Sequence, residues 1–435
     1  MKIKIDVNQA LGKIKPMHAT GQPPLSGVGR NSFQAFHYLS EIGTPFSRLH
    51  DVDGVFGGNR YVDVPNIFRD FDADENDPAS YDFAFTDALI TALYEAGIEP
   101  YYRLGVTIEN HSEIKAYRIY PPADYEKWAR ICEHIIAHYI DGWADGYHYN
   151  LRYWEIWNEP DDGHGINGRF SMMWLGTAED YYRLYDVTAK HLKARFPQIK
   201  IGGYGAIGFY AVTADPQSVT PNQQYYMDFF HGFIRYIKEH NTPIDFFSWH
   251  SYAWAGDALA QAKWLHETLV DYGMGELETH LNEWNPAHEQ RGTAHHSAQV
   301  AAIMLGMQNQ PGVDLLMIYD ARMTGTPYAA LFEPITRTPF HAYYALAAFD
   351  QLYKRGTQVS LVCDTDGVYA VAASDGKTCT LMLSNLSGKP QTPEIEGLDL
   401  EDARWYVLDQ QRLLSWSPAP KRIDNNAVIL AEVRL

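Results

Sequence analysis

Eight short β-like segments alternate with longer amphipathic segments between about residues 14 and 350. The candidate strands are 14–20, 45–50, 99–104, 152–157, 199–203, 245–250, 278–284 and 314–319. The candidate helices between them include 83–96, 124–139, 178–196, 225–240 and 295–308. Strands that alternate with helices are typical of a parallel sheet, and eight such units favour an α/β fold of the closed (β/α)8 TIM barrel type over a doubly wound sheet.

The pattern changes near residue 355, beyond which short strand candidates follow one another at 359–363, 368–373, 378–385, 404–409 and 427–433. The dipeptides Asp366-Gly367 and Asp375-Gly376 between them are hairpin signals. We therefore predict a catalytic barrel over residues 13–350 and a small antiparallel β-sandwich accessory domain over residues 351–435. The strand-like N-terminal segment, residues 1–12, is expected to pair into the β domain.

The charge balance limits the partners of the chain. It has 54 Asp and Glu against 35 Lys and Arg, a formal net charge of −19. Nucleic-acid binding depends on clustered Lys and Arg, and anionic membranes repel acidic surfaces, so neither partner is expected. No apolar run approaches the roughly 18 residues that a membrane-spanning helix needs. Residues 1–6 are charged where a signal peptide is apolar, which predicts a cytoplasmic location, although a trimmed chain would look the same. The oligomeric state is not indicated.

Two further features allow alternatives. The three cysteines, Cys132, Cys363 and Cys379, are too few for a disulfide framework. Cys363 and Cys379 lie in neighbouring strand-like segments, so a bond between them stays open. The acidic segment 70–77 reads as a solvated loop, with a calcium site as the alternative, because it supplies carboxylate oxygens without an EF-hand pattern.

The strongest local motif is Trp154-Glu-Ile-Trp-Asn-Glu-Pro160, an aromatic strand candidate that stops abruptly. Pro160 cannot continue a central strand, so Glu159 is left at the strand's carboxyl end. In a TIM barrel, active sites are built at the carboxyl ends of the strands. The side-chain amide of Asn158, next to Glu159, is a candidate for binding a substrate hydroxyl.

The segment His280-Leu-Asn-Glu-Trp-Asn-Pro286 repeats this pattern of an apolar strand, a glutamate and a proline. Its Glu283 lies 124 residues after Glu159, a distance of about three βα units. The two glutamates are therefore predicted at the ends of barrel strands 4 and 7, which face each other across the barrel. Trp284, directly after Glu283, is a candidate for the substrate-binding surface.

Two opposed carboxyl groups are the minimum equipment for hydrolysing a glycosidic bond. One is protonated and donates to the leaving oxygen, while the other is ionised and attacks the anomeric carbon or activates water. The alternative is that each glutamate only fills a buried salt bridge. The sequence contains no His-Glu-x-x-His motif, no Gly-rich phosphate loop ending in Lys-Ser/Thr and no Gly-x-Ser-x-Gly motif, so no metal or cofactor is expected.

Trp157-Asn-Glu-Pro160 together with Glu283 resembles the clan A glycoside hydrolases, which are retaining (β/α)8 barrels. More narrowly, the chain resembles glycoside hydrolase family 39, which includes β-xylosidases and α-L-iduronidases. The segments that carry the resemblance are 95–100, 121–128, 155–160, 184–190 and 280–285, in order along the predicted barrel. The resemblance implies that Glu159 is the general acid/base, that Glu283 is the nucleophile and that Asn158 binds the sugar 2-hydroxyl.

The resemblance also implies a supporting set of residues. His50, in Arg48-Leu49-His50, would contact the glycone, and Arg48 would support the nucleophile. In His250-Ser251-Tyr252, the tyrosine would hydrogen-bond the nucleophile. Hydrogen bonds from Arg48 and Tyr252 are expected to keep Glu283 ionised. A second interpretation of His50 and His250 is that they are core histidines.

One segment departs from the family pattern. Its β-xylosidases carry a tryptophan near the end of strand 8, where this chain has Tyr319, followed by Asp320 and Arg322. Asp320 is a candidate for binding a hydroxyl of a different sugar, and Arg322 for the carboxylate of a uronic acid. Alternatively, Asp320 and Arg322 pair with each other. The loop 328–339 is a candidate for closing the pocket.

The sequence thus predicts a retaining glycoside hydrolase that acts on an oligosaccharide or glycoside by double displacement. An exo-β-glycosidase of β-xylosidase type is favoured. The alternatives are an α-L-arabinoside, galactoside or uronide as substrate, or endo action on a polysaccharide. An alternative of another class is a catalytically silent carbohydrate-binding barrel.

Overall fold

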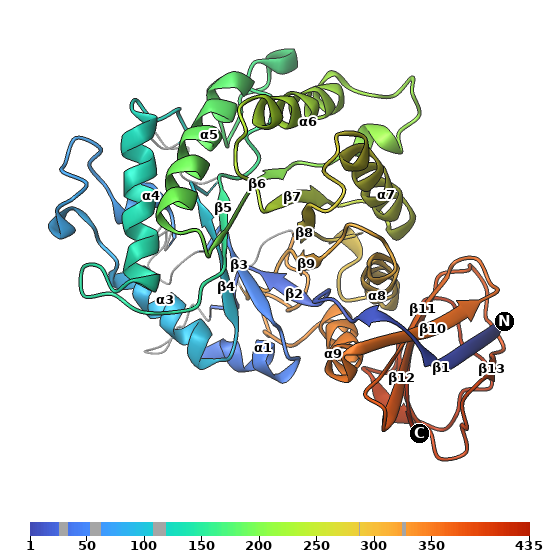
Figure 1. Cartoon of the computed structure of the whole chain (residues 1–435). Helices are drawn as coiled ribbons and strands as arrows, with labels where there is room; N and C mark the ends of the chain where they lie inside the picture. The colour runs from blue at the N-terminus through green and yellow to red at the C-terminus, as the bar shows by residue number, and fades with distance from the viewer. Residues whose placement is uncertain (26–33, 53–61, 108–118, 287, 324–327) are drawn as a thin grey trace.

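The computed structural model describes residues 1–25, 34–52, 62–107, 119–286, 288–323 and 328–435. Within these residues, eight parallel strands close into a barrel in chain order (Figure 1). The barrel strands are β2 (Ala19–Gly21), β3 (Phe46–Leu49), β4 (Glu99–Leu104), β5 (Tyr153–Ile156), β6 (Lys200–Ala206), β7 (Phe246–Ser251), β8 (Glu278–Trp284) and β9 (Leu315–Ile318). The predicted TIM barrel is confirmed.

Helices surround the barrel. They are α1 (His37–Glu41), α2 (Val64–Ile67), α3 (Ala84–Glu95), α4 (Tyr125–Ile140), α5 (Ala178–Arg195), α6 (Pro221–Glu239), α7 (Ala255–Asp271), α8 (Ala294–Gln308) and α9 (His341–Arg355). Local sequence fixes several of their starts. Thr177 and Thr220 form capping boxes at α5 and α6, and Asp124 accepts a hydrogen bond from the main-chain N–H of Lys127 at the start of α4.

The inward-facing residues of the barrel change from apolar to charged along the strands. Near the amino ends, a separate apolar cluster fills the barrel with Ala19, Phe46, Tyr101, Tyr153, Phe246, Leu315 and Met317. Two residues further along three of these strands lie Arg48, Arg103 and Glu155, none of which exposes any surface. Because side chains on a strand alternate with a period of two, both sets point into the barrel. The charged layer therefore lies toward the carboxyl ends.

The C-terminal part forms a curled mixed sheet, and β1 (Lys2–Lys13) from the N-terminus joins it (Figure 1). Its other strands are β10 (Thr357–Cys363), β11 (Val368–Ser374), β12 (Thr378–Asn385), β13 (Glu394–Glu396), β14 (Arg404–Leu408), β15 (Ser415–Ser417) and β16 (Val428–Arg434). Most neighbours are antiparallel, but β1 and β13 run parallel. The accessory β domain is confirmed as a single curled sheet with this one parallel pair among its described strands.

The start of the barrel differs from the sequence prediction. The first barrel strand was expected at residues 14–20, but β2 covers only Ala19–Gly21. β1 continues to Lys13, where it still pairs with β10, and residues 14–18 lie in neither strand. Pro16 lacks a main-chain N–H, so the segment between Lys13 and Ala19 cannot form a regular central strand.

The structure also resolves two open alternatives. Cys363 and Cys379 are both free, because β11 lies between their strands in the sheet. In the segment 70–77, Glu75 pairs with Lys127 and Arg130 of α4, and this described loop contains no cluster of metal-ligand atoms. No helix in the described part of the chain is long and apolar enough to cross a membrane.

Candidate active site

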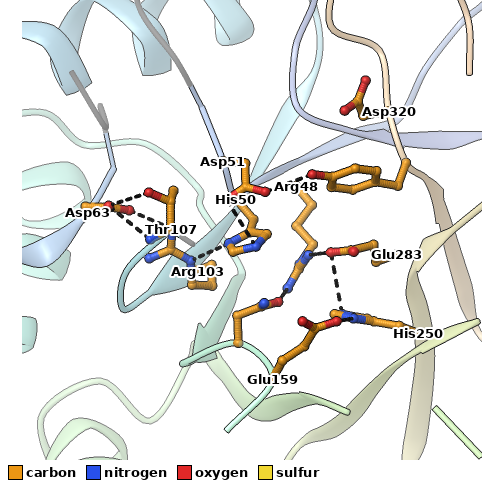
Figure 2. Close-up of polar contacts among 12 residues, drawn as sticks. Arg48, His50, Asp51, Asp63, Arg103, Thr107, Glu159, His250, Glu283 and Asp320 are labelled. Carbon is orange, nitrogen blue, oxygen red and sulfur yellow. Dashed lines mark hydrogen bonds and ion pairs between the residues drawn. The ribbon is translucent and has the colours of Figure 1, made fainter. Parts of the chain in front are cut away.

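Arg48 on β3 is the centre of the charged layer. Its Nε donates to Oε2 of Glu155 at 2.8 Å, its Nη1 to Oε2 of Glu283 at 3.0 Å and its Nη2 to Oδ1 of Asn158 at 2.5 Å. The guanidinium fork thereby fixes side chains from β5 and the turn after it and from β8, and Figure 2 shows its contact with Glu283. The second oxygen of Glu155 accepts hydrogen bonds from Ser248 and from Asn282, at 2.6 and 2.7 Å.

Glu155 is ionised in this arrangement. Burial opposes the charge, but the Arg48 cation and the hydrogen bonds from Arg48, Ser248 and Asn282 hold the pKa of Glu155 below its ordinary value. Glu155 therefore neutralises Arg48 and anchors it. Arg48 in turn presents one N–H group to Glu283.

A bulge in β8 brings Glu283 into the barrel. Trp249 and His250, which are consecutive on β7, pair with Leu281 and Glu283, so Asn282 is an extra residue in β8. Asn282 and Glu283 consequently both reach the interior, although strand alternation would send one of them outward. Tyr252, just beyond β7, donates to Oε1 of Glu283 at 2.8 Å, so both carboxylate oxygens of Glu283 are hydrogen-bonded.

Glu159 lies three residues beyond the end of β5, in a turn where its φ is +47°. Its main-chain N–H is held by the carbonyl oxygens of Tyr204 and Gly205 on β6. Nδ1 of His250 lies 2.8 Å from Oε1 of Glu159, and Nε2 of His250 lies 3.8 Å from Oε2 of Glu283. One oxygen of each carboxyl group and one nitrogen of His250 all lie within 4.8 Å of one another (Figure 2). The two predicted glutamates therefore meet at the barrel's carboxyl end.

The two carboxyl groups have different surroundings. Burial, together with the nearby charge of Asp162, raises the pKa of Glu159 to about 8. Burial also raises the pKa of Glu283, although the charges of His250 and Arg48 oppose it. The sequence-based expectation that Arg48 and Tyr252 would set the ionisation of Glu283 was incomplete, because loss of hydration outweighs them.

Gly205 allows the main chain of β6 to lie close to the polar side chains of the site. It lies at a bulge in β6 with φ of +64°, and its N–H donates to Oγ of Ser248. A Cβ atom at this position would lie 3.1 Å from Oδ1 of Asn158, 3.2 Å from Nε2 of His250 and 3.3 Å from Nη2 of Arg48. The main chain of β6 thus approaches the polar groups more closely than a side chain would permit.

A second polar group surrounds Tyr319, just beyond β9. Its hydroxyl donates to Oδ2 of Asp51 at 2.8 Å and accepts from Nη2 of Arg322 at 2.9 Å. Nε and Nη2 of Arg322 also lie 2.7 and 2.6 Å from Oδ2 of Asp320. Asp320 and Arg322 thus pair with each other, as one alternative predicted. Tyr328, at the start of the predicted closing loop, packs against the rings of Tyr319 and Tyr252.

His50 is held by a buried set of residues behind it. Nε of Arg103 donates to Nδ1 of His50 at 3.1 Å, and Nη2 of Arg103 donates to Asp63 at 2.7 Å. Thr107 donates to the second oxygen of Asp63 through both its main-chain N–H and its hydroxyl. Burial and the nearby arginines lower the pKa of His50 well below its ordinary value. His50 is therefore neutral, with its proton on Nε2, because Nδ1 accepts from Arg103.

Most sequence-predicted site residues are linked by these contacts: Arg48, His50, Asn158, Glu159, His250, Tyr252, Glu283, Tyr319, Asp320 and Arg322. Trp284 is different. It is fully buried in the main hydrophobic core, and no hydrogen bond of its indole Nε1 is formed among the described residues. It follows Glu283 directly, so strand alternation turns it to the opposite face. Its role in substrate binding stays a prediction.

The sequence analysis missed several residues of the network. Glu155 and Arg103 had a usable signal, because a charged residue in the middle of an aromatic strand must be paired inside the barrel. The part that Asn282 plays in the network could be recognised only once the bulge in β8 was known. Asp51 and Asp63 lie in segments after β3, where no periodicity indicates direction.

The convergence of Glu159, His250 and Glu283 is also a geometry that can hold a metal ion, since each offers one ligand atom. It is the single such group among the residues that the structure describes. Arg48 already neutralises this group in part, with its Nη1 on Glu283. The cation and the tyrosine donor on Glu283 suit a charged carboxylate that acts on an organic substrate.

The central role of Arg48 can be tested through stability. Arg48→Met is expected to lower the free energy of unfolding by roughly 3–5 kcal/mol, because Glu155 and Glu283 stay buried without their cation. Urea unfolding followed by tryptophan fluorescence measures this. Adding Glu155→Gln to the same chain should recover part of the loss, since a neutral amide needs no cation.

The matched control for Arg48→Met is Arg130→Met. Arg130 pairs with Glu75 at a site where its own side chain is 38% exposed. Its loss is expected to cost less than about 1 kcal/mol. A cost for Arg48→Met no larger than that of Arg130→Met would contradict the central role of Arg48.

A parallel barrel that joins two glutamates at the ends of its fourth and seventh strands defines a class, the (β/α)8 glycoside hydrolases. The chain belongs to glycosyl hydrolases family 39, whose family model matches residues 1–360. The predicted family resemblance is confirmed, and family membership implies a carbohydrate substrate.

Curated relatives are distant. A β-xylosidase from Geobacillus stearothermophilus is 22% identical over 334 residues, which are 68% of this chain and 60% of that relative. The chain thus spans less than two thirds of that relative's length. A β-xylosidase from Caldicellulosiruptor saccharolyticus is 22% identical over 470 aligned positions, covering 97% of this chain and 87% of the relative.

Solved structures support the fold. A glucosidase from Croceicoccus marinus superposes with a TM-score of 0.77 at 19% identity, covering 100% of this chain and 98% of the other. A family 39 β-xylosidase from Caulobacter crescentus gives a TM-score of 0.69 at 16% identity, with 100% of both chains covered. At these identities, the likeness concerns the architecture.

Proposed function

We propose that this chain is a retaining glycosidase in which Glu159 is the general acid/base and Glu283 the nucleophile. The observation that carries the proposal is the spacing of the two carboxyl groups, which bring one oxygen each to within 4.8 Å. Retaining enzymes hold their carboxyl groups about 5–5.5 Å apart, whereas inverting enzymes leave about 6.5–9.5 Å for a water molecule. Nearest oxygens within 4.8 Å fit the retaining arrangement, in which a carboxylate attacks directly.

The surroundings of each group suit its proposed role. A pKa of about 8 keeps Glu159 protonated at neutral pH, as a general acid requires. Glu283 accepts one hydrogen bond from Arg48 and one from Tyr252, which stabilise its ionised form. Of the two carboxyl groups, Glu283 has the direct contact with a cation, which favours its ionised form over that of Glu159.

The reaction then proceeds in two displacements. Glu159 gives its proton to the leaving oxygen while an oxygen of Glu283 forms a bond to the anomeric carbon and the glycosidic bond breaks. Glu283 loses its charge in the glycosyl-enzyme, so the pKa of Glu159 falls after it has lost its proton. Glu159 next takes a proton from water, whose oxygen attacks the anomeric carbon and releases Glu283.

For the substrate, we favour an exo-acting β-glycosidase of β-xylosidase type, in line with the names of the two curated relatives. A uronide is less well supported, because the guanidinium of Arg322 is already bonded to Asp320 and to Tyr319. α-L-Arabinosides, galactosides and longer glycans attacked internally stay as alternatives. Tyr319 and Asp320, where the family pattern has other residues, make the glycone the first property to measure.

The experiment is a panel of 4-nitrophenyl glycosides: β-D-xyloside, α-L-arabinoside, β-D-galactoside and β-D-glucuronide. We expect the fastest release from the β-xyloside and the slowest from the glucuronide. Proton NMR of the first product should show the β-anomer before mutarotation. The α-anomer as first product would rule out double displacement. No release from any glycoside, with retained sugar binding, would favour the silent binding barrel.

The pH dependence follows from Glu159. Because its pKa is about 8, the protonated acid is lost as the pH rises through that value. We expect kcat/KM to be constant just below pH 8 and to fall about tenfold per pH unit above it. Stopped assays with a 4-nitrophenyl glycoside measure this.

A substrate whose leaving group needs no proton provides the control for this pH dependence. With a 2,4-dinitrophenyl glycoside, the alkaline decline should be much weaker in the same buffers. An equal decline for both leaving groups would assign it to a group other than Glu159.

A further inference from the structure

Asp51 occupies an unusual position at the carboxyl end of β3. It lies two residues beyond Leu49, with φ of +50° in the left-handed region, and only 7% of its side chain is exposed. Oδ2 accepts the hydrogen bond from the Tyr319 hydroxyl at 2.8 Å. Oδ1 is buried and has no hydrogen-bond partner among the described residues. A buried carboxylate oxygen that makes no hydrogen bond is costly, and a ligand hydroxyl would satisfy it.

His50 lies next to this free oxygen. Its Nε2 is 3.4 Å from Oδ1 of Asp51, and the tautomer fixed by Arg103 places the proton on that nitrogen. A donor and an acceptor therefore stand side by side. In Figure 2 they lie on the other side of Arg48 from Glu159 and His250. This pair can bind a hydroxyl group, which both accepts and donates.

The charges around Asp51 show which ligands fit. Three buried arginines, Arg48, Arg103 and Arg322, each pair with a different carboxylate, namely Glu155, Asp63 and Asp320. The contact of Arg322 with Asp51 is to the main-chain oxygen, at 3.5 Å, and not to the carboxylate. Asp51 is thus a carboxylate without a cation of its own, which suits a neutral hydroxyl donor and repels an anion.

Asp51 is also close enough to act on the reacting groups. After burial, its charge is among those that raise the pKa of Glu159 and of Glu283. Contacts also connect the two places: Tyr319, which holds Oδ2 of Asp51, packs against the ring of Tyr252, and Tyr252 donates to Glu283.

We propose that Oδ1 of Asp51, beside Nε2–H of His50, accepts a hydrogen bond from one hydroxyl of the glycone, and that Asp51 thereby selects neutral sugars with a hydroxyl at that position. This inference rests on the proposed glycosidase function. Tyr319 serves as the positioning residue, because its hydroxyl holds the other oxygen of Asp51.

The test combines enzyme variants with substrate variants. The substrates are 4-nitrophenyl β-D-xylosides in which one glycone hydroxyl at a time is replaced by fluorine, which cannot donate a hydrogen bond. In the wild type, fluorine at the recognised position should lower kcat/KM about 10- to 100-fold, as expected for a hydrogen bond to a charged group. In Asp51→Ala, the same replacement should cost less than about threefold.

Two further variants separate binding from structure. Tyr319→Phe leaves Oδ1 of Asp51 in place, so the fluorine effect should persist at a reduced size. Asp320→Asn removes a neighbouring buried carboxylate that is already paired, so the fluorine effect should be unchanged whatever the overall rate of this variant.

A pH profile of Asp51→Asn adds a second readout, because loss of this charge should move the alkaline decline to lower pH. This substitution leaves the other groups that face Glu159 in place. They are its hydrogen-bond partner His250 and the charged residues Asp161, Asp162, Arg169, Arg48 and Glu283.

The inference is overturned if Asp51→Ala lowers kcat/KM equally for every substrate and leaves each fluorine effect at its wild-type size. In that case the wild type still hydrolyses the panel with retention, and the proposed function stands. Absence of glycosidase activity in the wild type overturns both together.

Discussion

Replacing Glu283 with alanine is expected to lower kcat by about 10⁴- to 10⁶-fold, the range seen when a covalent nucleophile is removed. The fold should survive, since Glu283→Ala leaves Arg48 paired with Glu155. Added azide should then attack the anomeric carbon from the vacated side. The product should be the glycosyl azide with inverted configuration, identified by NMR.

The matched control for this change is Glu278→Ala. Glu278 begins the same strand, β8, and pairs with Lys200 at the opposite end of the barrel. Its removal should change kcat less than about threefold, because surface ion pairs contribute little. If azide failed to rescue Glu283→Ala while the variant stayed folded and bound substrate, the assignment of the nucleophile would be wrong.

Replacing Glu159 with alanine is expected to have the second largest effect, and one that depends on the leaving group. General acid catalysis contributes about 10²- to 10⁴-fold, so aryl glycosides with poor leaving groups should lose rate by this factor. Substrates with a 2,4-dinitrophenyl group need no proton at the first step. With these substrates the glycosyl-enzyme should accumulate, because its hydrolysis lacks the general base. Azide should accelerate their turnover and give a glycosyl azide of retained configuration.

The opposite stereochemistry of the two azide products separates the roles of Glu159 and Glu283. The matched control is Glu179→Ala, which removes an exposed glutamate in the first turn of α5. It should behave as the wild type with both leaving groups. A uniform loss of rate for all leaving groups in Glu159→Ala would contradict a role in proton transfer.

The sequence alone identified the barrel and the position of its two glutamates, because both signals are local. Strand and helix periodicities repeat eight times, and the proline after each glutamate marks a strand end. A spacing of 124 residues then placed Glu159 and Glu283 opposite each other. In the structure His250, which the sequence indicated only as a supporting residue, lies between them and contacts both.

The sequence could not show contacts that depend on a single extra residue in a strand or on the direction in which a side chain points. Asn282 reaches Glu155 only because β8 has a bulge, and no pattern in the segment 278–284 predicts one. The left-handed turn at Asp51 directs its carboxylate toward Tyr319, which lies 268 residues later in the chain. The ionisation of Glu283 depended on the balance of burial against charge, which requires three-dimensional contacts.

The accessory sheet has a consequence for how the chain assembles. Its strand β1 precedes the barrel strands in the chain, but the neighbours of β1, which are β10 and β13, lie more than 340 residues later. During synthesis, the barrel can therefore close before the strands that pair with residues 2–13 have been made. β10 and β13, which follow the barrel, then pair with β1, so this sheet can form only after the barrel has been made. Deleting β1 should accordingly expose the edges of β10 and β13 and favour aggregation more than it slows the chemistry.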